Sequence, residues 1–122
     1  SSFDFAKNGI EFWHKQQNVP SEKLTLGVPF YGYNFTFPNV TSSTYGEIVK
    51  AGKQFAELDE LGKTYYNGRP TISKKVEYAV QNTGGIMIWE LAQDSFDEYS
   101  LLEVIHKKLN ALKISTTQLC GN

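Results

Sequence analysis

The sequence predicts an α/β fold in which two parallel strands belong to a larger sheet. Residues 84–91 contain an unbroken apolar run between polar flanks, a pattern typical of a parallel strand covered on both faces. A second strand pattern covers residues 23–33, and a helical pattern lies between the two. Strand, helix and strand in this order form the unit of α/β folds. Because two strands alone leave unpaired edges, we infer that the chain is the terminal part of a larger parallel architecture.

Composition narrows the class of protein. The chain has 122 residues, enough for one ordinary domain. Its formal net charge of -1 argues against a nucleic-acid binder, which needs a basic face. No apolar run is long enough for a membrane span, and the first residues lack the features of a signal peptide. The single cysteine, Cys120, excludes an internal disulfide and provides no ligand cluster for zinc, so we expect neither a metal nor another cofactor.

The chain begins with a predicted helix followed at once by a strand. Apolar residues at a spacing near 3.6 predict a helix over residues 3–17, capped by Ser1 or Ser2 and ended before Pro20. In the strand over 23–33, branched residues alternate with small ones, and Tyr31 falls on the side of the small residues. Small residues facing inward and branched ones outward fit a barrel wall capped by an aromatic side chain.

The segment between the strands is predicted to hold a loop, a short helix and a long helix. Turn-forming residues indicate a loop over 32–43, and two glycosylation-type triplets begin there at Asn34 and Asn39, for which chance is the better explanation. Capping-box spacing at 44–47 predicts a short helix. Residues 63–66 are predicted to be a short strand, which the turn signal Asn67-Gly68 ends.

The long helix is predicted to begin with Thr71 as its cap. We expect one face of this helix to be apolar and the opposite face to be in water. The apolar stripe consists of Ile72, Val76, Ala79 and Val80, and the expected water-facing residues are Lys74, Lys75, Glu77 and Gln81.

The second strand and a last helix complete the pattern. In the strand, Gly85, Met87 and Trp89 share one face, so that Ile86 and Ile88 on the other face can pack under helices. Residues 92–99 are predicted to be an acidic loop. A capping box at 100–103 predicts a helix that frays past residue 113, with a stripe of Leu101, Ile105, Leu109 and Leu112.

Residues 24–32 and 84–91 resemble two motifs of the family 18 glycoside hydrolases, the chitinase family. The motifs stand in the family's order, and the resemblance covers nearly the whole chain. It implies a TIM (β/α)8 barrel, of which residues 1–122 are the C-terminal part of the catalytic domain with strands seven and eight. Residues 34–70 then form a short insertion between these strands. Many relatives have a larger insertion, so we expect a shallower groove, open to short or branched glycans.

The resemblance also implies a sugar site at the carboxyl ends of the strands. Trp89 matches the tryptophan that forms the apolar floor under the sugar at the cleavage point, because the C–H face of a pyranose stacks on an aromatic ring. Tyr31 is expected either to contact sugar or to satisfy a backbone group at the barrel rim. Glu90 matches a subsite position in some members, although Glu90 and Asp94 would also fit as solvated loop carboxylates. Tyr33 stands where many relatives have arginine, and either contacts glycan or covers the insertion.

The family's chemistry is retaining hydrolysis of β-1,4 linkages beside N-acetylglucosamine. A glutamic acid donates the proton and the substrate's own N-acetyl group is the nucleophile. That glutamate belongs to the fourth strand and lies outside this chain, so we expect no catalytic residue here and no activity of the isolated chain. The expected partners are a glycan containing N-acetylglucosamine and the N-terminal part of the barrel. The resemblance also implies a secreted, periplasmic or cell-surface location.

Two alternatives stay open. The family includes lectin-like barrels that keep the aromatic floor and have lost the acid, so the parent protein would then bind carbohydrate without cleaving it. The other alternative is an independent small α/β domain without a sugar function.

Overall fold

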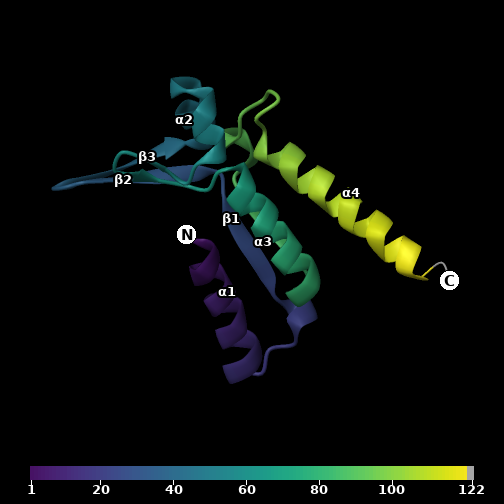
Figure 1. Ribbon diagram of the computed structural model, residues 1–122. Helices are drawn as coiled ribbons and strands as arrows, with labels where there is room; N and C mark the ends of the chain where they lie inside the picture. The colour runs from purple at the N-terminus through teal and green to yellow at the C-terminus, as the bar shows by residue number, and fades with distance from the viewer. Residues whose placement is uncertain (121–122) are drawn as a thin grey trace.

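Two parallel strands form the centre of the fold (Figure 1). β1 (Thr25–Pro29) pairs with β6 (Gly85–Trp89) in parallel, with Thr25 opposite Gly85 and Pro29 opposite Trp89. α3 (Arg69–Asn82) lies between them in the chain. The predicted strand-helix-strand unit is therefore confirmed. The computed structural model describes the backbone of residues 1–120 and the side chains of residues 1–113.

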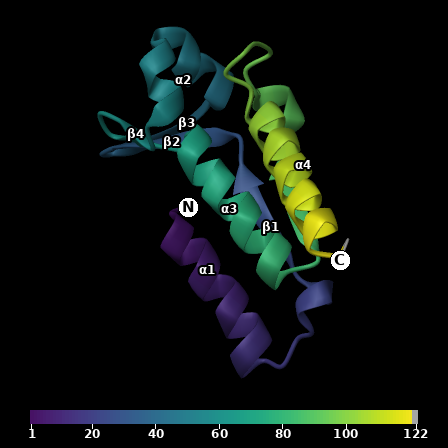
Figure 2. The same cartoon turned by 45° about the vertical axis from the view of Figure 1, so that its right-hand side comes forward.

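Helices cover one side of the strand pair. α1 (Phe3–Glu11), α3 and α4 (Leu101–Cys120) lie side by side with α3 in the middle, as the two views in Figures 1 and 2 show. Leu26 and Val28 of β1 are buried in the core on this side, and Ile86 and Ile88 of β6 pack against it. The opposite face carries exposed Met87 and Trp89. The predicted division of the two strand faces is correct.

A second, antiparallel sheet follows β1 and corrects two predictions. Its strand order is β3-β2-β5-β4, and its strands are β2 (Tyr31–Thr36), β3 (Asn39–Thr44), β4 (Glu60–Leu61) and β5 (Thr64–Tyr65). The predicted strand over 23–33 is thus two strands in different sheets, and the predicted loop over 32–43 is a hairpin. The turn itself is confined to the tip at Phe37-Pro38, where the peptide bond is cis. The flanking Tyr, Phe, Val and Thr residues favour strands.

Shorter elements complete the insertion and the connections. They are α2 (Tyr45–Ala51), a π-helical turn η1 (Phe12–Gln16), and the 3-10 turns η2 (Ser21–Lys23), η3 (Lys53–Glu57) and η4 (Leu91–Gln93). α2 has the predicted capping box, in which the Glu47 backbone N–H donates to the Thr44 hydroxyl and the Thr44 backbone N–H donates to the Glu47 carboxylate. The predicted strand at 63–66 is confirmed as β5. The turn before β5 is made by Gly62, whose φ is +59°, whereas Asn67-Gly68 leads into α3.

α3 begins earlier than predicted and presents a different face to the core. Its cap is Gly68, and Pro70 lies in its first turn. Thr71 is inside the helix, where its hydroxyl donates to the Asp59 carboxylate. Ile72, Val76 and Ala79 are buried as expected, whereas Val80 is 47% exposed.

Lys75 is fully buried rather than facing water. Its Nζ donates to the Ser1 carbonyl oxygen at 2.8 Å, to the Ser1 hydroxyl at 3.1 Å and to Asn67 Oδ1 at 2.6 Å. These acceptors come from two other segments of the chain. The periodicity of α3 does not reveal them, and this is why the prediction for Lys75 is wrong.

α4 has the predicted stripe and runs further than predicted. Leu101 and Ile105 are buried, and Leu109 packs against the core. The Glu103 backbone N–H donates to the Ser100 hydroxyl, as the capping pattern predicts. The helical backbone continues to Cys120, so the prediction that it frays past residue 113 is wrong.

Candidate functional site

Trp89 and Tyr31 lie at the carboxyl ends of the two parallel strands. Trp89 is the last residue of β6 and is 61% exposed. Tyr31 begins β2, with only Phe30 between it and the end of β1. Both side chains line a hollow of about 390 Å³. The other residues that line it are Tyr33, Ser42, Ser43, Thr44, Glu47 and Gln93.

The walls of this hollow combine aromatic rings with hydrogen-bonding groups. The rings come from Trp89, Tyr31 and Tyr33, and the polar groups come from β3, α2 and η4. Gln93 Oε1 is buried and has no hydrogen-bond partner among the residues that the structure describes. An aromatic surface beside hydrogen-bonding groups suits a ligand that has an apolar face and a polar edge.

A second, smaller hollow lies on the open face of the parallel strands. Its volume is about 200 Å³, and Trp89 and Tyr31 also line it. Its remaining lining residues are Ser1, Gly27, Val28, Pro29 and Met87. Trp89 and Tyr31 therefore line both hollows.

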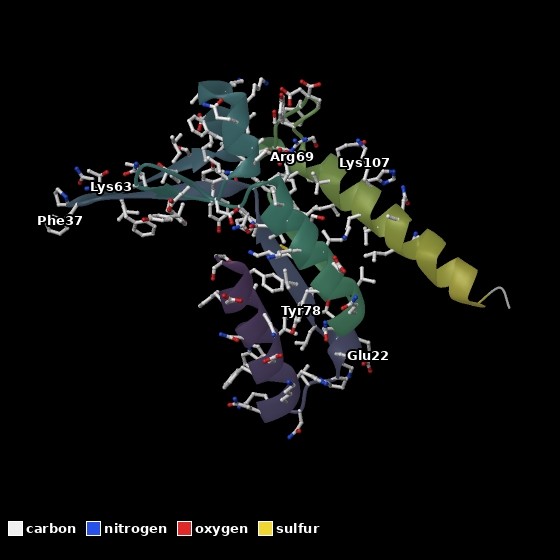
Figure 3. All side chains as sticks on the ribbon, in the orientation of Figure 1. Glu22, Phe37, Lys63, Arg69, Tyr78 and Lys107 are labelled. Atoms are coloured by element: carbon white, nitrogen blue, oxygen red, sulfur yellow. The ribbon has the colours of Figure 1, made fainter. Side chains whose placement is uncertain are left out.

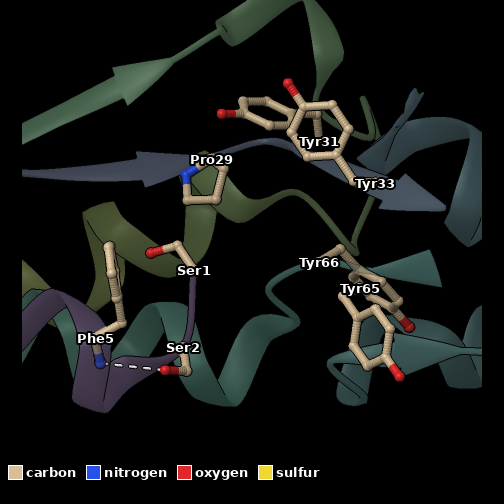
Figure 4. Close-up of a pocket in the computed structure, with 8 residues that line it drawn as sticks. All are labelled: Ser1, Ser2, Phe5, Pro29, Tyr31, Tyr33, Tyr65 and Tyr66. Carbon is tan, nitrogen blue, oxygen red and sulfur yellow. Dashed lines mark hydrogen bonds between the residues drawn. The ribbon is translucent and has the colours of Figure 1, made fainter. Parts of the chain in front are cut away.

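Tyr31 and Tyr33 form a ridge beside a third hollow. Their ring centroids are 5.4 Å apart with the rings nearly perpendicular. The hollow has a volume of about 490 Å³, and its other lining residues are Ser1, Ser2, Phe5, Pro29, Tyr65 and Tyr66. Figure 4 shows the Tyr31 and Tyr33 rings on one wall of this hollow and the Tyr65 and Tyr66 rings on another.

Glu90 and Asp94 occupy different environments. Glu90 is exposed directly after Trp89, and its carbonyl oxygen accepts a hydrogen bond from the Gln93 backbone N–H at 3.0 Å. Asp94 is buried. Its carboxylate accepts hydrogen bonds from the Leu101 and Leu102 backbone N–H groups at 2.8 and 3.0 Å. The interpretation of Asp94 as a solvated loop carboxylate is therefore wrong, because this side chain holds the start of α4.

Several residues of these hollows escaped the sequence analysis. Gln93 and the serines of β3 have no local motif and meet Trp89 only through the fold. Phe35 follows Tyr31 and Tyr33 at a period of two, a signal for one strand face that the predicted loop concealed. Tyr65 reaches the same sheet by pairing opposite Tyr33.

Within the described part of the chain, no group of three or more His, Cys, Asp or Glu residues is placed to hold a metal ion. Among the described residues, no helix has both the length and the apolar composition needed to cross a bilayer.

Comparison with known proteins identifies relatives of this chain. Residues 5–94 match the model of the glycosyl hydrolases family 18. The GH18 chitinase ChiB from the chitin utilization locus of Flavobacterium johnsoniae is 81% identical over 93% of this chain, with a TM-score of 0.89. A chitinase from Bacteroides thetaiotaomicron is 34% identical over 88% of the chain, with a TM-score of 0.81.

A further relative is a chitinase-like agglutinin from Robinia pseudoacacia. It is 28% identical over 84% of this chain, with a TM-score of 0.63. The chain spans 36% of the Flavobacterium chitinase, 38% of the Bacteroides chitinase and 37% of the agglutinin. It therefore corresponds to little more than a third of each of these proteins.

Proposed function

Because this chain belongs to family 18 of the glycosyl hydrolases, we propose that it is the C-terminal part of a chitin-hydrolysing TIM barrel, with β1 and β6 as strands seven and eight. The parallel pairing of β1 and β6 supports this assignment. So does the packing of helices on one side of the pair, which leaves the small and aromatic residues on the other side. In TIM barrels the helices lie outside and active sites form at the carboxyl ends of the strands.

We propose that Trp89 is the floor under the sugar at the cleavage point and that Tyr31 is the adjacent wall. The observation that carries this proposal is that both rings line one hollow at the carboxyl ends of adjacent parallel strands, beside polar groups. A pyranose stacks its C–H face on an indole and directs its hydroxyl groups to the sides. Tyr33 and the exposed Glu90 are proposed as further contacts at the edges of the site.

In this proposal the chain binds and orients the substrate and does not donate the proton. The proton donor is a glutamic acid on the fourth strand of the parent protein. The substrate's N-acetyl oxygen attacks the anomeric carbon while the glycosidic C–O bond breaks, and the leaving oxygen takes the proton of the glutamic acid. Water then attacks the same carbon, opens the cyclic intermediate and returns a proton to the glutamate, with overall retention of configuration. Stacking on Trp89 holds the sugar ring in place, which lowers the entropic cost of this attack.

The test is hydrolysis of the tetramer of N-acetylglucosamine by the intact parent protein, followed by proton NMR at early times. We expect β-anomeric products, as retention requires. The control is a parent variant in which glutamine replaces the fourth-strand glutamate, which we expect to lose turnover. Products that first appear as the α-anomer, or no turnover by a parent that has the glutamate, would contradict the proposal.

A carbohydrate-binding protein without catalysis is the second candidate. The similarity to the chitinase-like agglutinin favours it. A parent that lacks the fourth-strand glutamate, and that binds the tetramer in calorimetry without releasing shorter products, would establish this candidate in place of the enzyme.

A further inference from the structure

We propose that Lys75 is a positioning residue for the reaction, because it holds the segment at Ser1 in the wall of the sugar site at Trp89. The inference rests on the proposed function, since it gives a role in the same reaction to a residue outside the sugar-binding surface. Lys75 lies on α3 and lines none of the three hollows described above. It therefore acts on the site through Ser1.

Lys75, Asn67 and Ser1 form a closed hydrogen-bonded group, here called the lysine node. Lys75 Nζ donates to the carbonyl oxygen and the hydroxyl of Ser1 and to Asn67 Oδ1. Asn67 Nδ2 donates to the same Ser1 carbonyl oxygen at 2.9 Å and to the Tyr66 carbonyl oxygen at 3.0 Å. Two donors, one on α3 and one at the end of the insertion, therefore fix one backbone group of Ser1.

The lysine node is buried, although burial of a charge does not favour stability by itself. Lys75 is fully buried and Asn67 is 2% exposed. Removing an ammonium group from water costs several kcal/mol, and well-packed apolar residues in place of a buried charge are often neutral or stabilising. The other buried residues of α3 include Ile72 and Val76, so an apolar side chain would suit this face. The lysine is better explained by the place that it gives to Ser1.

Ser1 connects the lysine node to the sugar site. It lines the hollow of about 200 Å³ together with Trp89 and Tyr31, and it also lines the hollow of about 490 Å³ shown in Figure 4. In the proposed barrel α1 precedes strand seven, so the segment that enters α1 comes from the carboxyl end of strand six. Loops at this end of the strands build the active sites of TIM barrels. A displacement of Ser1 would therefore move a wall beside Trp89.

A ring contact between α1 and α3 accompanies the lysine node. Figure 3 shows Arg69 at the start of α3 and Tyr78 further along the helix. The Tyr78 ring packs on Phe3 edge to face, with the ring centroids 5.8 Å apart. A ring contact tolerates a wider range of positions than hydrogen bonds to a carbonyl oxygen do. The lysine node therefore sets the position of Ser1 more closely than this packing does.

The test combines kinetics on the tetramer of N-acetylglucosamine with hydrogen exchange, both in the intact parent. Burial lowers the pKa of Lys75 to about 8, so the lysine keeps its proton in assays at about pH 6.5. Lys75→Met removes the three donors, and we expect kcat to fall roughly tenfold with less than about a threefold change in KM, because a displaced wall acts on the chemical step.

The second variant is Asn67→Asp, which keeps the acceptor for Lys75 and loses the donor to Ser1. We expect it to lower kcat by about threefold. The backbone N–H groups of Phe5 and Ala6 donate to the Ser2 hydroxyl and carbonyl oxygen, next to Ser1. We expect these amides to exchange faster in both variants, because the segment before α1 is then held less closely.

The matched control is Val76→Ala, because Val76 is buried next to Lys75 on α3 and lies outside the lysine node. We expect a lower melting temperature with unchanged kcat and unchanged exchange at Phe5 and Ala6. A loss of kcat in this control as large as that in Lys75→Met would mean that Lys75 acts only through stability, and would overturn the inference. Unchanged kcat in both Lys75→Met and Asn67→Asp would overturn it while leaving the proposed function intact. No turnover by a parent that has the fourth-strand glutamate would overturn both.

Discussion

The backbone N–H of Phe30 donates to the carbonyl oxygen of Trp89 at 2.9 Å. This bond continues the β1–β6 ladder one residue past the pair Pro29 and Trp89, to the point where the chain turns into β2. Phe30 is fully buried, and its own carbonyl oxygen accepts from the Tyr45 backbone N–H at 2.9 Å. One buried residue therefore joins β6 to the start of α2. The backbone of Trp89 is held in place while its indole stays exposed.

Replacing Trp89 by alanine in the intact parent is expected to lose far more sugar affinity than replacing Tyr33. The indole is the largest aromatic ring that lines the hollow. Removing the Tyr33 ring leaves the neighbouring Tyr31 ring in place. We expect a loss of roughly 2 kcal/mol or more for Trp89→Ala and about 0.5–1 kcal/mol for Tyr33→Ala. Calorimetry with the tetramer measures both.

Trp89→Phe is the control for this comparison, because it keeps an aromatic face at the same position. We expect it to retain part of the affinity. Equal losses of sugar affinity in Trp89→Ala and Tyr33→Ala would mean that Trp89 is not the floor of the site.

Asp94→Ala is expected to destabilise the protein without changing sugar binding directly. The carboxylate accepts from the Leu101 and Leu102 backbone N–H groups and from the Ser100 hydroxyl, and it is buried. Removing it leaves these donors at the start of α4 without their partner. We expect the free energy of unfolding to fall by about 2 kcal/mol, measured by urea denaturation of the parent.

Glu98→Ala serves as the matched control on the same loop, since the Glu98 side chain is exposed. Its effect on the free energy of unfolding is expected to stay within about 0.5 kcal/mol. Similar effects of the two substitutions would show that Asp94 does not hold α4.

We expect the free energy of unfolding to rise between about pH 8 and pH 10 because of the lowered pKa of Lys75. Burial lowers the pKa of Lys75 from 10.5 to about 8, and the nearby Asp59 charge partly opposes this. In this window the unfolded lysine still holds its proton while the folded one has released it. The unfolded state therefore binds more protons, and stability increases with pH.

Tyr66 is expected to act in the opposite direction at higher pH. Burial raises the pKa of Tyr66 from 10.0 to about 12, so above about pH 10 the unfolded tyrosine ionises first and stability falls. Melting temperatures from pH 7 to 11 for the parent and for Lys75→Met measure both effects. We expect the melting temperature of the parent to rise relative to that of Lys75→Met as the pH increases from about 8 to about 10. A difference in melting temperature that does not change with pH would contradict the lowered pKa of Lys75.

The isolated 122-residue chain is expected to show no chitinase activity. The parallel strands leave their outer edges unpaired and their Trp89 face open, and the proposed proton donor lies elsewhere in the parent. Assays with the tetramer, sedimentation and thermal melting of the pure chain measure this. Turnover would contradict the assignment of the acid. Cooperative unfolding of a monomer would favour an independent α/β domain.

Sequence patterns predict correctly those features that depend on residues close together in the chain. Thr44 and Glu47 are three residues apart and form the predicted capping box. Ser100 has the same spacing to Glu103 and accepts the predicted hydrogen bond from the Glu103 backbone N–H. The strand faces at β1 and β6 follow from alternation alone. The capping pattern at Thr71 predicts too late a start for α3, whose cap is Gly68 and whose first turn contains Pro70. The β2–β3 hairpin was missed because its strands become stable only through pairing with each other and with β5.

The sequence by itself predicted that two strands run in parallel, which of their faces is covered by helices, and that Trp89 lies at the end of the second strand. These features depend on residue spacing, which the linear chain displays directly. Only the tertiary structure decided that Lys75 is buried, that Gln93 shares a hollow with Trp89, and that Tyr65 joins the rings of β2. Each of these depends on contacts between segments far apart in the chain, and side-chain periodicity within one segment carries no information about the neighbours that folding brings to it.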